Sequence, residues 1–160
     1  MQIEKPNRVE RSYVQRLVAG PAAVFELLCP VREADWLDGW NPRRVLSESG
    51  TAEEGCVFIT AAEPEDAIWT ITRRDPSAGR VEMVKVTPQV TVCRLRITLA
   101  PAAHGTDATV TYRHTSLGEL GDAWIAGFTE AYYIGFMRDW ERAMNHYLRT
   151  GQCLREGSDA

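Results

Sequence analysis

Apolar residues recur at steps of three and four over the last part of the chain. They are Tyr133, Phe136, Met137, Trp140, Ala143, Met144, Tyr147 and Leu148. This spacing predicts a long amphipathic helix with one broad apolar face. Such a face needs a partner, and the segments between residues 43 and 115 have the pattern of short β-strands. The simplest arrangement is one antiparallel sheet packed against one long carboxy-terminal helix.

Seven segments are rich in strand-forming residues and are separated by turn signals such as Ser49-Gly50 and Pro88-Gln89. We expect strands at residues 10–18, 43–49, 56–61, 67–73, 80–87, 90–100 and 108–114. The clearest alternation places Leu95, Ile97 and Leu99 opposite polar residues. A sheet with one buried and one solvated face has this pattern.

Two short helices are expected between the first two strands. Gly20-Pro21 ends the first strand, and Pro21 suits the first turn of a helix over residues 21–28. Residues 31–36 can form a second helical turn before the turn signal Asp38-Gly39. The connection between strands is therefore helical rather than a simple loop.

A second helical pattern precedes the long helix but points in another direction. Its apolar positions are Leu117, Leu120, Trp124, Phe128 and Tyr132. On a straight helix these positions are rotated by roughly 140° from the later apolar face. We therefore expect a bend or break between residues 127 and 135, where Gly127 and Gly135 lie. The first half can then cover the mouth of a cavity while the second half packs on the sheet.

Composition narrows the classes of function. A chain of 160 residues suits a single domain, which we place at residues 10–150 with flexible termini at 1–9 and 151–160. The formal charge of −4 does not favour nucleic-acid binding. Four widely spaced cysteines suggest free thiols and no metal site. Neither a signal peptide nor a membrane-spanning segment is evident, so we expect a cytoplasmic protein. We also expect no cofactor.

The order of elements, together with Gly20–Leu28 (GPAAVFELL) and Glu33–Trp40 (EADWLDGW), resembles the START-like superfamily, also called SRPBCC. The resemblance is to its polyketide cyclase/dehydrase-like branch of bacterial proteins and covers residues 10 to about 150. Phe136 stands where that family usually has Trp. These motifs specify a fold better than an activity.

The resemblance implies an α+β helix-grip fold. In that fold a curved seven-stranded antiparallel sheet wraps around a long carboxy-terminal helix, and two short helices follow the first strand. Sheet and helix enclose a deep, mostly apolar tunnel. Members of the family bind lipids, sterols, polyketides, plant hormones and aromatic compounds; some are cyclases, and others assist a heat-shock chaperone. The implied partner is a hydrophobic small molecule.

Tyr112 and His114 share a face with Val110 on the last predicted strand. If Val110 faces the helix, a phenol and an imidazole also point inward. An imidazole can act as general acid or base, and a phenol can orient a ligand carbonyl. The alternative is a structural role, in which His114 bonds to backbone or lies half exposed near the strand end.

Aromatic residues supply the other candidates for ligand binding. Trp36 and Trp40 flank a turn near one mouth of the predicted tunnel, where they can stack on a ligand or simply fix the short helices to the core. Trp69 is expected on the inner face of the sheet. The ligand-binding candidates are Trp36, Trp40, Trp69, Tyr112, His114, Trp124, Phe128 and Tyr132.

Binding of a hydrophobic or aromatic small molecule, lipid-like or polyketide-like, is the function we expect. One alternative is a polyketide cyclase or dehydratase in which His114 or Tyr112 moves a proton. Another is a chaperone-assisting interaction protein, which needs an exposed apolar patch. The sequence contains no nucleotide-binding or nucleophile motif, and the pattern around Glu33, Asp35 and Asp38 does not indicate buried carboxylates. The sequence does not decide whether the chain forms a homodimer.

Overall fold

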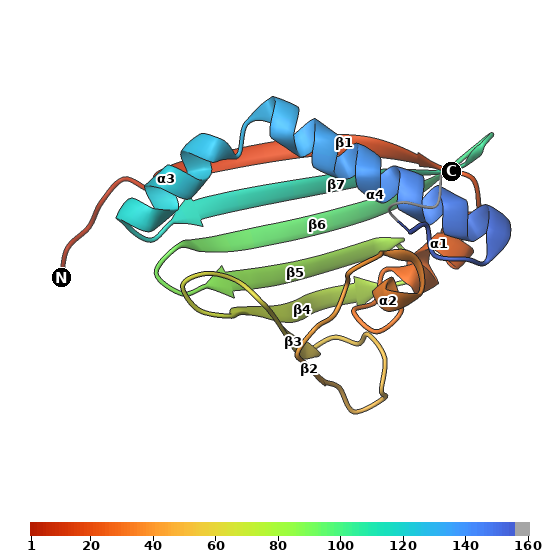
Figure 1. The fold of residues 1–160 in the computed structure, drawn as a ribbon, viewed down its shortest axis with the longest axis horizontal. Coiled ribbons are helices and arrows are strands. Elements are labelled where there is room, and N and C mark those ends of the chain that lie inside the picture. Colours follow the sequence, from red (N-terminus) through yellow and green to blue (C-terminus); the bar gives the residue numbers. More distant parts are fainter. Residues whose placement is uncertain (156–160) are drawn as a thin grey trace.

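A seven-stranded antiparallel sheet curves around one long helix in the computed structural model, which describes residues 1–155 (Figure 1). The strand order is β1-β7-β6-β5-β4-β3-β2. The strands are β1 (Arg8–Leu17), β2 (Arg44–Leu46), β3 (Val57–Thr60), β4 (Ala67–Asp75), β5 (Arg80–Thr87), β6 (Thr91–Ala102) and β7 (Gly105–Ser116). The seven predicted strands are all present, and the predicted fold class is confirmed.

Four helices lie around this sheet (Figure 1). They are α1 (Pro21–Leu27), α2 (Glu33–Trp36), α3 (Glu119–Gly127) and α4 (Glu130–Thr150). Helix α4 packs against β1, and α3 packs against β7 near the opposite end of the strands from α1 and α2. The sheet and these helices therefore surround the part of the inner face that α4 does not cover.

The predicted break in the carboxy-terminal helix is confirmed between Gly127 and Glu130. Thr129 caps the new helix, because its hydroxyl accepts a hydrogen bond from the backbone N–H of Tyr132 at 3.2 Å. Gly135 lies inside α4 and causes no interruption. The change of direction is thus absorbed by two residues at the start of the predicted interval.

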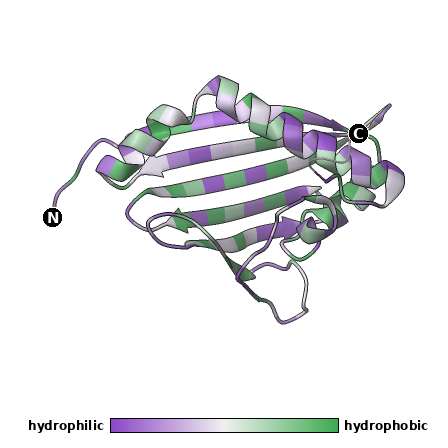
Figure 2. Ribbon diagram, viewed as in Figure 1, coloured by the Kyte–Doolittle hydropathy of each residue, from purple (hydrophilic) through white to green (hydrophobic). Residues whose placement is uncertain are grey.

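Side chains on the inner face form rows across the sheet, because residues directly opposite one another on neighbouring strands share a face. Hydrophobic and hydrophilic residues alternate along the central strands (Figure 2). One row, which we call the lysine row, consists of His114, Cys93, Lys85, Trp69 and Phe58. The next, the tyrosine row, consists of Tyr112, Leu95, Met83 and Ile71.

Helix α4 is fixed to the sheet by buried hydrogen bonds as well as apolar contacts. The Asn145 side chain accepts from the backbone N–H of Val18 and donates to the carbonyl of Arg16, both at 2.9 Å. Gln15 donates to the carbonyl of Met137 at 2.9 Å, and the Tyr133 hydroxyl donates to a β7 carbonyl at 2.5 Å. These bonds hold α4 on the β1 and β7 side of the sheet.

The ends of the chain are more structured than the sequence suggests. Strand β1 already begins at Arg8, and the carbonyl of Asn7 accepts a hydrogen bond from Ser116 at 2.9 Å. Near the other end, Leu154 forms an isolated parallel bridge with Leu37. Residues 156–160 of the predicted flexible tail lie outside the described residues.

Two glycines of α3 show how closely this helix packs against the sheet. A Cβ atom at Gly121 would overlap the backbone carbonyl of Val90, whereas one at Gly127 would meet nothing within 4 Å. We expect Gly121→Ala to lower the free energy of unfolding by about 1–3 kcal/mol, as overpacking does. Gly127→Ala should change it by less than about 1 kcal/mol.

Urea denaturation measures both variants, and hydrogen exchange of the α3 amides shows whether the loss is local. Equal stability of the two variants would mean that α3 can shift without cost.

Candidate ligand cavity

A cavity of about 420 Å³ lies between the inner face of the sheet and the helices. Strands β3 to β7 supply Phe58, Thr60, Trp69, Met83, Lys85, Leu95, Ile97, Tyr112 and His114. The helices and the segments next to them supply Leu28, Glu33, Leu37, Gly39, Trp40, Asn41, Ala61, Trp124, Phe128, Tyr132, Phe136 and Trp140. Most of this lining is apolar or aromatic, as in small-molecule sites.

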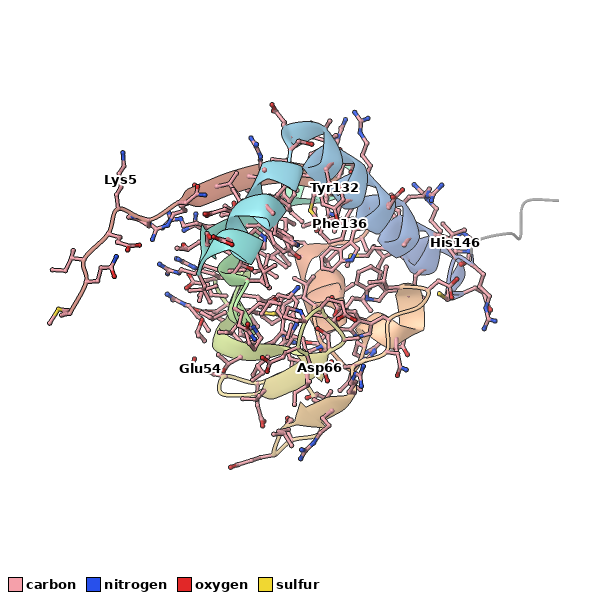
Figure 3. All side chains as sticks on the ribbon, turned by 60° about the vertical axis from the view of Figure 1, so that its left-hand side comes forward. Lys5, Glu54, Asp66, Tyr132, Phe136 and His146 are labelled. Carbon is pink, nitrogen blue, oxygen red and sulfur yellow. The ribbon has the colours of Figure 1, made fainter. Side chains whose placement is uncertain are left out.

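Aromatic rings from α3 and the start of α4 close one side of the cavity. Trp124 and Phe128 lie with ring centroids 5.0 Å apart and contact the His114 ring at 4.2 and 4.7 Å. Figure 3 shows Tyr132 and Phe136 on α4, above the interior of the molecule. Trp124 is 38% exposed and Tyr132 is 57% exposed. Both residues therefore lie where the cavity meets solvent.

The opposite wall is a second aromatic group on the sheet. Phe58 and Trp69 stack with centroids 5.3 Å apart, and Trp40 meets Phe58 edge to face at 6.3 Å. Both indole N–H groups have partners: Trp69 donates to the Thr60 hydroxyl at 2.9 Å and Trp40 to the carbonyl of Pro30 at 2.8 Å. These rings are held in place and line the cavity.

Lys85 is a functional candidate that the sequence analysis missed. Its Nζ lies 4.9 Å from the centroid of the Trp69 ring, a cation–π contact. Its amine makes no hydrogen bond or ion pair with any residue that the structure describes. Burial lowers the pKa of its amine, because desolvation disfavours the charged form. In the sequence, Lys85 alternates in phase with Val81 and Met83 on one strand. This phase is the signal that indicates an inward side chain.

His114 is only 3% exposed, and neither ring nitrogen has a hydrogen-bond partner. Burial and, to a smaller extent, the charge of Lys85 together lower its pKa to about 4. The imidazole is therefore neutral at pH 7, with one nitrogen able to donate and one able to accept. The predicted inward orientation of His114 is confirmed.

Tyr112 occupies the middle of the cavity wall. Its ring lies 5.9 Å from those of His114 and Tyr133, and 6.0 Å from that of Phe136. Burial raises its pKa well above the usual value, so the hydroxyl stays protonated. This hydroxyl has no hydrogen-bond partner among residues 1–155. Its predicted inward orientation is also confirmed.

Glu33 corrects the expectation that the acids near the second helix are solvated. It is 8% exposed, lines the cavity from α2, and has no partner for its carboxyl group among the described residues. Burial raises its pKa from 4.5 to about 8. The signal in the sequence was its position three residues before Trp36, which places both on one side of the helical turn.

Trp36 is the one predicted ligand-binding residue that does not line the cavity. It is fully buried, donates from Nε1 to the carbonyl of Leu27 at 3.2 Å, and meets Trp140 edge to face at 5.2 Å. It joins α2 to α1 and α4, as the structural alternative proposed. The other seven candidates line the cavity: Trp40, Trp69, Tyr112, His114, Trp124, Phe128 and Tyr132.

The described part of the chain contains no group of three or more His, Cys, Asp or Glu residues arranged to hold a metal ion. Within the same residues, no helix is both long enough and apolar enough to cross a bilayer. The chemistry that the cavity offers comes from its amine, carboxyl, phenol and imidazole groups.

No family model and no curated protein sequence matches the chain. Several solved structures are similar to it. Norcoclaurine synthase from Thalictrum flavum is similar with a TM-score of 0.67 and 9% identity, over 91% of this chain and 88% of that one. The Mll3558 protein from Rhizobium loti has a TM-score of 0.63 and 12% identity, covering 89% and 99%. Ara h 8.0201 has a TM-score of 0.59 and 13% identity, covering 91% and 99%.

Similarity at these identities is evidence about the fold. Each neighbour covers nearly all of this chain, so the likeness includes the sheet, the short helices and the long helix together. The chain therefore has the helix-grip fold that these neighbours share, as the resemblance in its sequence implies.

Proposed function

We propose that the protein binds a hydrophobic or aromatic small molecule in the cavity between the sheet and α4. The observation that carries the proposal is a largely aromatic cavity of about 420 Å³ that contains four polar groups whose side chains make no hydrogen bond or ion pair with the described residues. These groups are the Glu33 carboxyl, the Lys85 amine, the Tyr112 hydroxyl and the His114 ring.

Unpartnered polar groups in a buried place destabilise a fold, by about 1–3 kcal/mol for each neutral group. A ligand that hydrogen-bonds to them recovers part of that cost on binding. Its apolar body adds about 25 cal/mol for each Å² removed from water, before ordering costs. Aromatic walls on both sides favour a flat ligand, since stacked rings bury area with defined geometry.

The structural neighbours share the fold but do not select a ligand. One of them is a synthase, which means that the fold can host a reaction as well as binding. A fold alone does not choose between these functions. The polar groups inside the cavity must therefore distinguish ligand binding from catalysis.

An enzyme of the polyketide cyclase or dehydratase type is the second candidate, and Glu33 and His114 favour it. Burial raises the pKa of the carboxyl group to about 8 and lowers that of the imidazole to about 4. The two groups therefore hold a proton and a free lone pair, respectively, near neutral pH. Titratable groups with pKa values displaced in opposite directions are a feature of acid–base sites.

Native mass spectrometry of the purified protein tests for a bound molecule, and extraction under denaturing conditions identifies its class. Titration of the folded, ligand-free protein with phenylnaphthylamine, a neutral fluorescent aromatic compound, tests the cavity directly. Saturable binding of one molecule per chain is expected. An absence of binding to this probe and to lipid-like competitors would contradict the proposed function.

Trp124→Ala should weaken phenylnaphthylamine binding by about tenfold, because it removes an aromatic wall at the mouth of the cavity. The variant should remain folded, since the side chain is 38% exposed and lies at the mouth of the cavity. Leu120→Ala is the matched control: it lies on the same helix, is 53% exposed and does not line the cavity. Equal affinities of the two variants would exclude Trp124 from the site.

Glu33→Gln tests whether the buried carboxyl group keeps its proton. The folded protein holds a proton that the unfolded chain loses above pH 4.5, so the wild-type free energy of unfolding falls between pH 4.5 and about 8. Gln does not titrate, and the variant should gain stability over the wild type across that window. At about 1.36 kcal/mol for each pKa unit, the gain approaches roughly 5 kcal/mol.

Chemical denaturation at several pH values gives this difference. Glu26→Gln, on the exposed side of α1, is the control and should follow the wild-type curve, because it keeps Glu33. A difference between Glu33→Gln and the wild type that stays constant from pH 4.5 to 8 would show that Glu33 ionises normally.

A further inference from the structure

Lys85 is the one lysine or arginine among the residues that line the cavity. The only acidic residue among them is Glu33, which makes no ion pair with Lys85 and retains its proton near neutral pH. The face of Trp69 covers the amine from one side. On the sheet itself, Lys85 therefore has an aromatic neighbour but no counter-ion.

Other donors lie close to this amine. Lys85 and His114 belong to the lysine row and are separated by Cys93 on the strand between them. Both side chains line the same cavity. Tyr112 lies two residues before His114, on the same face of β7, and its hydroxyl has no protein partner.

Cys93 does not change this pattern. It is completely buried within the row, and burial raises the pKa of its thiol to about 12. The thiol therefore remains neutral and cannot serve as the missing anion. The amine, the phenol and one imidazole nitrogen are all hydrogen-bond donors directed toward the same cavity.

We propose that the ligand carries a carboxylate group, and that this group pairs with the Lys85 amine while the apolar body lies between the aromatic walls. The proposal rests on the proposed function, because it assigns a chemical class to the ligand of that cavity. His114 and Tyr112 supply further hydrogen bonds to the carboxylate oxygens.

The physical basis is the cost of an isolated charge. An ammonium group without a counter-ion is unfavourable away from water, and a carboxylate beside it forms a charge-assisted hydrogen bond of roughly twice the ordinary strength. A neutral amide of the same size cannot supply the negative charge. The cavity should therefore select an aromatic acid over its amide.

The lysine content of the chain permits a sharp test, since Lys5 and Lys85 are its two lysines. Lys5 lies on the amino-terminal segment, away from the cavity (Figure 3). We would measure displacement of phenylnaphthylamine by naphthoic acid and by naphthamide in the wild type, Lys85→Met and Lys5→Met. The readout is the ratio of the two affinities within each protein.

Naphthoic acid should bind the wild type and Lys5→Met at least about tenfold more tightly than naphthamide. In Lys85→Met this preference should disappear or reverse. Equal affinities in the wild type, or a preference that survives in Lys85→Met, would overturn the proposal. Failure of phenylnaphthylamine to bind at all would instead contradict the proposed function, so the two failures are distinct.

A measurement on the unmutated protein covers the case in which Lys85→Met does not fold. With nitrogen-labelled lysine, the side chains give two amine signals in an NMR spectrum. Naphthoic acid should shift the Lys85 signal and raise the pKa of its amine, and should leave the Lys5 signal in place. A Lys85 signal that responds equally to naphthoic acid and naphthamide would contradict the ion pair.

Discussion

The interruption at Phe128 and Thr129 determines whether this molecule has a cavity at all. Apolar residues before and after it point in different directions, so a single straight helix could not bury both sets against one sheet. With the interruption, α4 packs on the β1 and β7 side through Gln15 and Asn145, while α3 sits at the strand ends. The inner face of β3 to β6 is then left for side chains that line a space rather than fill it.

The groups in that space are maintained at a cost to stability. Burial pushes the Glu33 carboxyl and the His114 imidazole toward their neutral forms, and it leaves the Lys85 amine without an anion. A leucine or methionine at any of these positions would avoid the desolvation penalty. Binding and catalytic sites commonly retain such groups because the ligand supplies the missing interactions. Glu33 and His114 support both proposed functions, which differ in whether a proton moves after binding.

Residue patterns predicted the sheet, the helices and much of the aromatic lining, because alternation and helical spacing determine which face of an element is buried. Tyr112, His114 and Trp69 were identified by their phase with apolar neighbours. The pattern did not indicate Lys85 although it has the same phase, because a charged residue is normally assigned to the solvated face of a strand. Glu33 was missed because its burial depends on how a four-residue helix packs against α4. Trp36 was assigned to the cavity on its proximity to a turn, and only tertiary packing against Trp140 shows that it faces the core.

The choice of lysine at position 85 fits a site that is alternately empty and occupied. The chain has eighteen basic residues, of which two are lysines, so arginine is its usual cation. A guanidinium group remains charged under all physiological conditions, and in an empty apolar cavity it would be a permanently isolated charge. Burial lowers the pKa of the Lys85 amine, so its charged form is less favoured in the empty cavity than beside a carboxylate. Lysine therefore limits the cost of the empty state while keeping the strong interaction for the occupied one.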